Sequence, residues 1–234
     1  MARLTLLHIA DAHVDYFAAL VGQMAQDIDL HQEVHAPWLA RAQQGDATLK
    51  ADIANTAAAH RQAGLVMCTC STIGPMAEAA GALRVDRPMM AQAANIGGTI
   101  LLAYALASTR EVSANLLQDE LQKTGRAAVV RPLDLSEFWP LFEAGERQAF
   151  RACVAAAVRA AHKDAPVSTV VLAQVSMAGA APMLADLGVP VISAPQAALD
   201  RLRPTRAGQK LAQKVAMRCI CTPMPPYRAP QHPE

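Results

Sequence analysis

The sequence predicts an α/β protein made of two related halves, each a parallel sheet flanked by helices, with the active site in the cleft between them. Two observations support this fold class. Short apolar segments alternate with longer alanine-rich segments, and the apolar segments are hydrophobic over nearly their whole length, as in strands buried on both faces. In addition, three landmarks of the first half of the chain recur in the same order in the second half.

The strands are predicted from apolar runs bounded by polar or turn-forming residues. None of these runs is long enough to cross a bilayer. In chain order they span residues 3–10 (RLTLLHIA), 65–69 (LVMCT), 87–91 (RPMMA), 98–105 (GTILLAYA), 127–133 (AAVVRPL), 168–174 (STVVLAQ) and 189–193 (VPVIS).

Four helices are predicted between these strands, at residues 36–64, 108–125, 146–163 and 194–203. The helix at 146–163 has the clearest apolar face, with hydrophobic residues spaced three and four apart from Phe150 onward. In the helix at 108–125, Ser108 and Glu111 have the spacing of a capping box, and Gly125 marks the end. Asp46 is expected to cap the helix at 36–64.

Composition excludes several classes of function. The formal net charge is +1 and aromatic residues make up 4% of the chain, so neither an electrostatic surface for nucleic acid or membrane nor base-stacking platforms are expected. The first residues lack a signal-peptide pattern, and the five cysteines are an odd number. A cytoplasmic protein with reduced thiols is therefore predicted.

No metal site is predicted. His31 and His35 are four residues apart, but their segment does not show a firm helical pattern and offers no evident third ligand. The Gly-Gly-Thr at 97–99 precedes a strand instead of following one, so it is not a nucleotide-binding fingerprint.

The predicted domains follow the internal repeat. The first half comprises residues 1–95 together with 190–217, and the second half comprises residues 96–189. Residues 218–234 form a proline-rich C-terminal tail, which is expected to be an extended arm or disordered.

The repeat aligns three pairs of segments. LVMCTCST is aligned with VVLAQVSM, which sets Cys70 opposite Gln174 and Thr72 opposite Ser176. The other landmarks pair Leu6 with Leu101 and Pro88 with Pro190. Chance similarity between Ala/Val-rich strands is the alternative explanation. If the repeat is real, like strand ends from the two halves meet at one cleft.

The ends of two strands supply the candidate site residues. Ligands of open parallel sheets bind beyond the carboxyl ends of the strands, where helix N-termini favour anionic groups. Ser71, Thr72 and Ser176 are therefore candidate holders of a carboxylate. Cys70 is a candidate thiolate, because a helix N-terminus lowers a thiol pKa, whereas Cys68 lies deeper on the same strand and is expected to be core.

Two further residues follow the first strand. His13 stands just beyond it, with a ligand-facing and a surface position equally expected. Asp11 is expected to cap the following helix, with substrate contact as the alternative. His8 lies within the strand and is expected to be a hydrogen-bonded core histidine.

The motifs CTCSTIGP, VVLAQVSMAGAAP and RLTLLHIADAH resemble those of the aspartate/glutamate/hydantoin racemase superfamily, over residues 3–203. The resemblance implies two Rossmann-like halves related by a pseudo-twofold axis, an active site in the cleft and no cofactor. It also implies a small carboxylate-bearing substrate, and a homo-oligomer is a candidate assembly, since the superfamily commonly forms dimers or larger species.

In the racemases of this superfamily, one cysteine from each half flanks the substrate carbon. Cys70 matches the first cysteine, but the second position holds Gln174, which does not exchange a proton at neutral pH. The resemblance therefore favours a racemase-like subgroup, in which Cys70 is the proton carrier, Gln174 orients the substrate and His13 is a second candidate acid/base. The alternatives are a decarboxylase or isomerase of a small dicarboxylic acid, and a non-catalytic relative that binds small anions.

Overall fold

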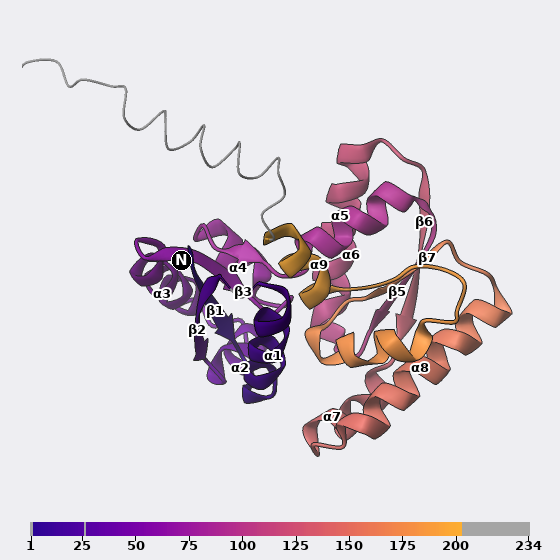
Figure 1. The fold of residues 1–234 in the computed structure, drawn as a ribbon, viewed down its shortest axis with the longest axis horizontal. Coiled ribbons are helices and arrows are strands. Elements are labelled where there is room, and N and C mark those ends of the chain that lie inside the picture. Colours follow the sequence, from indigo (N-terminus) through magenta and orange to yellow (C-terminus); the bar gives the residue numbers. More distant parts are fainter. Residues whose placement is uncertain (1, 26, 203–234) are drawn as a thin grey trace, which may run out of the picture. The chain divides into compact units, whose positions relative to one another are not determined.

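The computed structural model describes residues 2–25 and 27–202 of the chain (Figure 1). It contains two four-stranded parallel sheets, with strand orders β2-β1-β3-β4 and β6-β5-β7-β8. The predicted fold class is confirmed. The strands are β1 (Ala2–His8), β2 (Ile28–Val34), β3 (Gly64–Cys68), β4 (Leu83–Arg84), β5 (Gly98–Tyr104), β6 (Ala128–Asp134), β7 (Thr169–Leu172) and β8 (Val191–Ser193).

Helices connect successive strands, as parallel pairing requires. They are α1 (Val14–Met24), α2 (Pro37–Gln43), α3 (Leu49–Arg61), α4 (Gly74–Ala79), α5 (Arg87–Ile96), α6 (Ala107–Thr124), α7 (Trp139–Glu143), α8 (Arg147–Asp164) and α9 (Ala194–Leu202), with 3₁₀ segments η1 (Asp11–His13), η2 (Ser136–Phe138) and η3 (Val175–Leu184).

Equivalent hydrogen bonds show that the two sheets repeat one pattern. The N–H of Thr69 donates to the carbonyl of Leu7 at 3.0 Å, and the N–H of Ala173 donates to that of Ala103 at 2.9 Å. Thr69 therefore corresponds to Ala173, and the next residues, Cys70 and Gln174, correspond as predicted. The predicted alignment of β1 with β5 was shifted by one residue. It paired Leu6 with Leu101, whereas the structure pairs Leu7 with Ala103 and therefore Leu6 with Leu102.

The third landmark was wrong. Residues 87–91 are not a strand: Arg87 begins helix α5, with Pro88 in its first turn, where the missing N–H costs nothing. The strand is the two-residue β4, Leu83–Arg84. Pro88 thus corresponds in position to Pro195, the second residue of α9, and not to Pro190, which precedes β8.

The predicted helix at 36–64 is two helices, because Asp46 interrupts it. The carboxylate of Asp46 accepts hydrogen bonds from the N–H of Thr48 at 2.8 Å and from the guanidinium of Arg41 at 2.7 Å. Asp46 therefore organises the turn before α3, while Gly64 is already the first residue of β3. Ser108 caps nothing, since α6 begins one residue earlier, but Gly125 ends that helix with φ of 64° as expected.

Two elements that were predicted in the first half, β8 and α5, pack with the second sheet. Residues 190–217 were assigned to the first half, yet β8 pairs with β7 in the second sheet, Val191 opposite Val170. Helix α5, assigned to the first half, packs against β7, β8 and α6. Residues 203–217 of this segment and the predicted tail at 218–234 lie outside the described residues.

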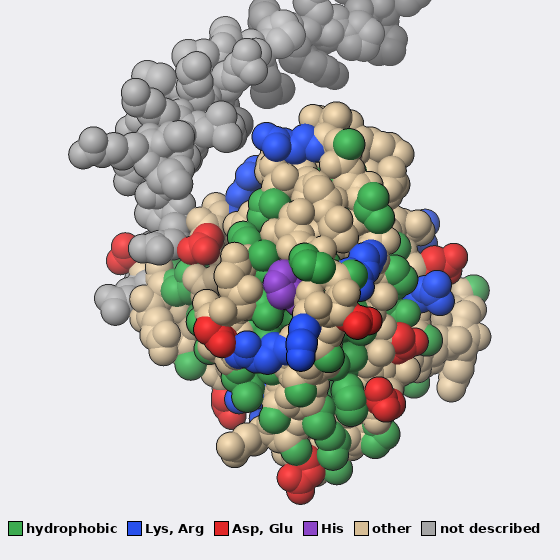
Figure 2. Space-filling model, turned by 90° about the vertical axis from the view of Figure 1, so that its right-hand side faces the viewer, with side chains coloured by type: hydrophobic (Ala, Val, Ile, Leu, Met, Phe, Trp, Pro, Cys, Tyr) green, Lys and Arg blue, Asp and Glu red, His purple; other side chains and the backbone are tan. Residues whose placement is uncertain are grey.

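Each sheet has a core of its own. In the first half, Leu7, Val66 and Cys68 pack with Ile53 and Ala57 of α3. In the second, strand residues of β5 and β7 pack with Phe150, Val154 and Val158 of α8, the face predicted from its periodicity. No helix within the described ranges is long and apolar enough to cross a membrane. On the face drawn in Figure 2, basic and acidic side chains are interspersed.

Candidate active site

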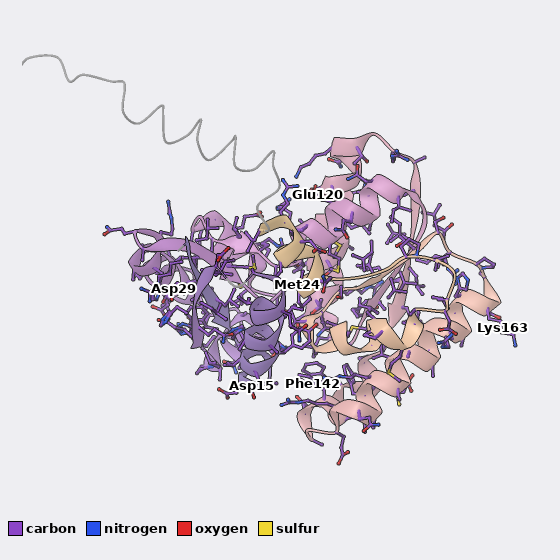
Figure 3. All side chains as sticks on the ribbon, viewed as in Figure 1. Asp15, Met24, Asp29, Glu120, Phe142 and Lys163 are labelled. Carbon is purple, nitrogen blue, oxygen red and sulfur yellow. The ribbon has the colours of Figure 1, made fainter. Side chains whose placement is uncertain are left out.

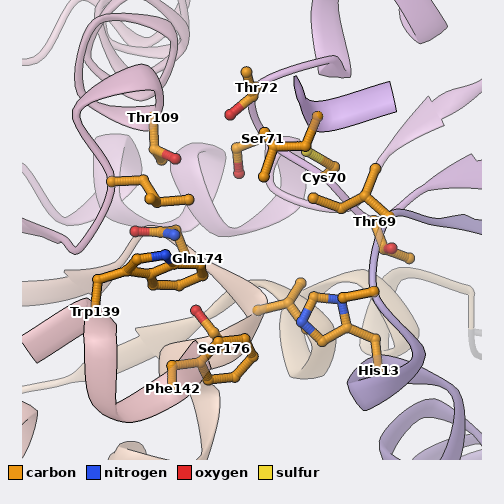
Figure 4. A pocket seen from close by; sticks show the side chains of 15 residues that line it. His13, Thr69, Cys70, Ser71, Thr72, Thr109, Trp139, Phe142, Gln174 and Ser176 are labelled. Carbon is orange, nitrogen blue, oxygen red and sulfur yellow. The ribbon is translucent and has the colours of Figure 1, made fainter. Parts of the chain in front are cut away.

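A cavity of about 90 Å³ lies at the carboxyl ends of strands from both sheets (Figure 4). This is the position at which parallel α/β sheets bind ligands. Its walls come from the segments that follow β1, β2 and β3 in the first half and β5, β6 and β7 in the second. The lining residues are Ile9, Ala10, His13, Leu39, Thr69, Cys70, Ser71, Thr72, Leu106, Thr109, Trp139, Phe142, Gln174, Val175 and Ser176.

Cys70 is buried in this wall, with 7% of its surface exposed. The prediction of a lowered thiol pKa is wrong. Burial raises the pKa of Cys70 above its ordinary value, and the opposing effect of the N–H groups of Ile73 and Thr72 and the Thr72 hydroxyl is smaller. Cys70 is therefore a thiol at neutral pH and a proton donor in its resting state. Cys68 is fully buried in the core, as expected, and does not line the cavity.

Gln174 lies across the cavity from Cys70, on the segment after β7 (Figure 4). Its Oε1 accepts a hydrogen bond from the N–H of Ala105 at 2.5 Å. This bond occupies the oxygen end of the amide, whereas Nε2 has no hydrogen-bond partner within the described residues. Gln174 thus offers an N–H donor to a ligand.

The two predicted hydroxyl groups after β3 have partners of their own. Ser71 donates to the carbonyl of Ala173 at 3.1 Å, a bond that joins the ends of β3 and β7. Its hydroxyl proton is therefore not free for a carboxylate. Thr72 Oγ1 lies 3.3 Å from Ser108 Oγ, at the start of α6. Ser176 differs, since its Oγ is a buried atom without a hydrogen-bond partner among the described residues.

His13 lines the cavity, which decides between the two predicted positions. It is 9% exposed, and both ring nitrogens lack a partner in the described part of the chain. Burial lowers its pKa to about 4, with smaller contributions from the charges of His8 and Arg147. His13 is therefore a neutral imidazole at neutral pH, able to accept a proton.

Its neighbour His8 has the expected core role. The Nδ1 atom lies 2.8 Å from Thr69 Oγ1 and the Nε2 atom 3.0 Å from Gln32 Oε1. Asp11, in contrast, is exposed, makes no side-chain cap and does not line the cavity, so the structure does not bring it to the site. Asp11 lies two residues before His13 in η1, and Asp11 is exposed where His13 is buried.

A second cavity, of about 270 Å³, adjoins the first and shares His13, Phe142, Val175 and Ser176 with it. Arg147 and Arg151, one turn apart on α8, line this second cavity. Neither forms an ion pair with a carboxylate among the described residues. Asp15, beside Phe142 in Figure 3, is its acidic member, and Tyr16 adds a phenol. The cavity as a whole favours an anionic group.

Sequence reasoning missed these arginines and the aromatic wall. Trp139 and Phe142 stack at 4.9 Å between ring centroids and line the small cavity. Both follow β6, as Leu39 follows β2 at the same place in the first sheet. Three aromatic residues, Phe138, Trp139 and Phe142, follow the end of a predicted strand in a chain with only 4% aromatics, and this cluster was the available signal.

No protein-family model matches the sequence, and no curated protein is detectably similar to it in sequence. Solved structures do match. The aspartate racemase of Picrophilus torridus is 12% identical with a TM-score of 0.62, covering 86% of this chain and 93% of that one. The allantoin racemase of Klebsiella pneumoniae is 18% identical with a TM-score of 0.61, covering 93% and 89%. The chain therefore shares the fold of these two racemases.

The resemblance inferred from the motifs is thus confirmed at the level of the fold. A more distant match is a Gly74Cys mutant of arylmalonate decarboxylase, 14% identical with a TM-score of 0.51, covering 91% of this chain and 94% of that one. Two different reactions are named among the proteins that share the fold. The chemistry of this chain must therefore be argued from its own site residues.

Proposed function

We propose that the chain is a cofactor-independent isomerase of the racemase or epimerase kind. It acts on a carbon next to a carboxylate or carbonyl group, with Cys70 as a single-thiol proton carrier. The observation that supports this most directly is the composition of one small cavity. A protonated thiol, which follows β3, and a neutral imidazole, which follows β1, both line it at the strand ends of the first sheet, and the imidazole has no hydrogen-bond partner among the described residues.

The protonation states give the two groups different roles. His13, with a pKa of about 4, is neutral and accepts the proton from the substrate carbon. Cys70, with its raised pKa, is a thiol and returns a proton to the carbanion. The cycle closes when the His13 imidazolium releases its proton to solvent and the Cys70 thiolate takes one up. A bound anion raises the pKa of His13 by charge attraction, which strengthens it as a base when the substrate is present.

The remaining polar groups hold the substrate. The Thr72 and Ser176 hydroxyls and the backbone N–H of Ser71 bind the carboxylate beside the reacting carbon, and Gln174 donates its Nε2–H to it. These donors stabilise the negative charge that develops on the carboxylate or carbonyl oxygen when the proton leaves.

Arg147 and Arg151 indicate the class of substrate. They line the cavity that continues from His13 and Ser176 and have no carboxylate partner among the described residues. A substrate with a second anionic group, such as an acidic amino acid or a dicarboxylic acid, places that group between them. Gly179 helps to position Arg151, because a Cβ there would overlap the guanidinium.

The test is proton exchange at carbon. The full chain is incubated in deuterium oxide with pools of amino acids, hydantoins and substituted malonates, and deuterium incorporation is followed by NMR and chirality by chiral chromatography. Cys70→Ala is expected to lower the exchange rate by at least about 100-fold, the lower range for loss of a general acid or base. The matched control is Cys68→Ala, which removes a thiol two residues away that does not line the cavity. An undiminished rate in Cys70→Ala overturns the proposal.

Arg151→Met tests the substrate class. A net interaction of about 1.5–3 kcal/mol for a hydrogen bond to a charged group corresponds to a rise in KM of about 10- to 100-fold for a substrate with two acidic groups. The KM of a substrate with one acidic group is expected to stay within about twofold. Arg159→Met is the control, because Arg159 is on the same helix but pairs with Asp186 and lines neither cavity.

Decarboxylation is the second candidate, favoured by the glutamine at 174. With a single thiol in the cavity, a carbanion formed by loss of carbon dioxide needs only one protonation, which Cys70 supplies. The same screen distinguishes it, since carbon dioxide is released from malonates without exchange in amino acids or hydantoins. Binding without exchange or gas release, measured by calorimetry, would identify a non-catalytic anion-binding protein.

A further inference from the structure

Three histidines surround one carboxylate at the edge of the first sheet. Glu33 Oε1 lies 2.8 Å from His60 Nε2 and 3.2 Å from His31 Nε2. Its other oxygen, Oε2, lies 3.2 Å from His35 Nε2. The nitrogen and oxygen atoms of His31, Glu33 and His60 all lie within 4.8 Å of one another. None of the four residues lines the cavities of the candidate active site.

The fold brings these side chains together from distant parts of the sequence. His31 and Glu33 alternate along β2, so both point to one face of the sheet. In the parallel register Glu33 is opposite Leu7, which packs with α3 in the core of this half. The same face therefore meets α3, whose last turn contains His60.

The spacing of the donor atoms suits one small divalent ion. Zinc binds imidazole nitrogen and carboxylate oxygen at about 2.0–2.2 Å, and two ligands of a tetrahedral ion are then about 3.3 Å apart. The Glu33 distances to His60 and His31, 2.8 and 3.2 Å, are close to that separation. Imidazole and carboxylate together are ligands that zinc accepts readily.

Charge and support are also appropriate. The carboxylate of Glu33 is the acidic member of the cluster, and it supplies the negative charge that a divalent cation needs beside two imidazoles. His35 holds the second oxygen of this carboxylate and is itself stacked on Trp38, with ring centroids 3.8 Å apart and an angle of 6° between the rings.

We propose that His31, Glu33 and His60 form a binding site for a divalent zinc-type cation, with His35 as a positioning residue for Glu33. No metal site was predicted from the sequence, because the segment of His31 and His35 lacks a firm helical pattern and offers no evident third ligand. They lie on and after a strand, and His60 from α3 supplies the third ligand.

The test measures zinc binding to the full chain after treatment with a chelator. Zinc is titrated in competition with a chromophoric chelator, and X-ray absorption at the zinc edge reports the ligand atoms. His60→Gln is expected to lower zinc affinity by more than about 100-fold, because even residues behind the ligands change affinity by about 10- to 100-fold. His35→Phe, which keeps a ring on Trp38, is expected to lower it by about 10- to 100-fold.

Two controls make the result specific. His162→Gln replaces a histidine in the last turn of α8, the position that His60 has in α3, and is expected to leave zinc affinity unchanged. Cys219→Ser with Cys221→Ser removes two thiols outside the described residues and is expected to leave it unchanged too. The proposal is overturned if His60→Gln, folded by circular dichroism, binds zinc like the unmodified chain, if the edge spectrum shows sulfur ligands, or if no binding is detected.

Discussion

Replacing Gln174 by methionine tests how much the hydrogen bond between Gln174 and Ala105 contributes to stability. The Oε1 atom accepts the N–H of Ala105 at 2.5 Å, and Ala105 is completely buried. Methionine fills a similar volume but has no comparable acceptor, so this N–H loses its partner where water does not reach it. An unsatisfied buried donor costs about 1–3 kcal/mol. At about 2–4 °C per kcal/mol for a chain of this size, the melting temperature falls by about 2–12 °C.

Urea unfolding followed by circular dichroism measures this loss as a free energy. Gln174→Glu, compared at pH 5, is the control, because burial raises a carboxyl pKa and the largely neutral acid keeps an acceptor oxygen for Ala105. It is expected to be more stable than Gln174→Met at that pH. The reasoning fails if Gln174→Met unfolds within about 0.5 kcal/mol of the unmodified chain, the range of substitutions that break no such contact.

Three further predictions concern stability. The folded pKa of His13, about 4, is below its unfolded value, so the unfolded chain takes up the proton first as the pH falls. Stability present above about pH 6.5 is then lost toward pH 4, by up to about 3 kcal/mol. In His13→Gln, the free energy of unfolding measured in urea should depend less on pH in this range. An unchanged pH dependence contradicts the burial argument. Arg84 binds Asp86 through two hydrogen bonds of 2.9 and 2.8 Å, with both side chains buried. Arg84→Met alone should lower the free energy of unfolding by about 3–5 kcal/mol, because it leaves the Asp86 charge unpaired, and Arg84→Met with Asp86→Leu should lower it clearly less. Equal losses in the two variants would contradict this explanation. Phe150→Ala, in the core between α8 and its sheet, should cost about 3–5 kcal/mol by calorimetry, and a loss below about 1 kcal/mol would show that this core is loosely packed.

The sequence predicted the larger elements because their patterns are long. The face of α8 around Phe150 and the continuous apolar runs of β5 and β7 leave little choice of structure. Residues 87–91 were wrong because a short apolar run does not distinguish a strand from the first turns of a buried helix, and Pro88 fits a helix start. The actual strand, β4, has two residues, too few for a periodic signal.

The candidate site divides in the same way. Cys70 and Gln174 were found together because an internal repeat marks equivalent strand ends, and equivalent strand ends meet in this fold. Arg151 and His60 were not found, because each reaches its cavity or cluster from one turn of a helix whose orientation depends on tertiary packing. The pKa of Cys70 was predicted with the wrong sign, since burial, which the sequence does not show, outweighs the N–H groups near the sulfur.

The cavity has matching backbone on its two sides but unlike side chains at the corresponding positions Cys70 and Gln174. With an amide opposite a sulfhydryl, hydrogen delivered by the sulfhydryl reaches a flat carbanion from one direction only. In a reversible isomerisation the final mixture is still set by the relative free energies of the two isomers. In a decarboxylation, where loss of carbon dioxide does not run backward, the same duplicated backbone would give a product of a single handedness.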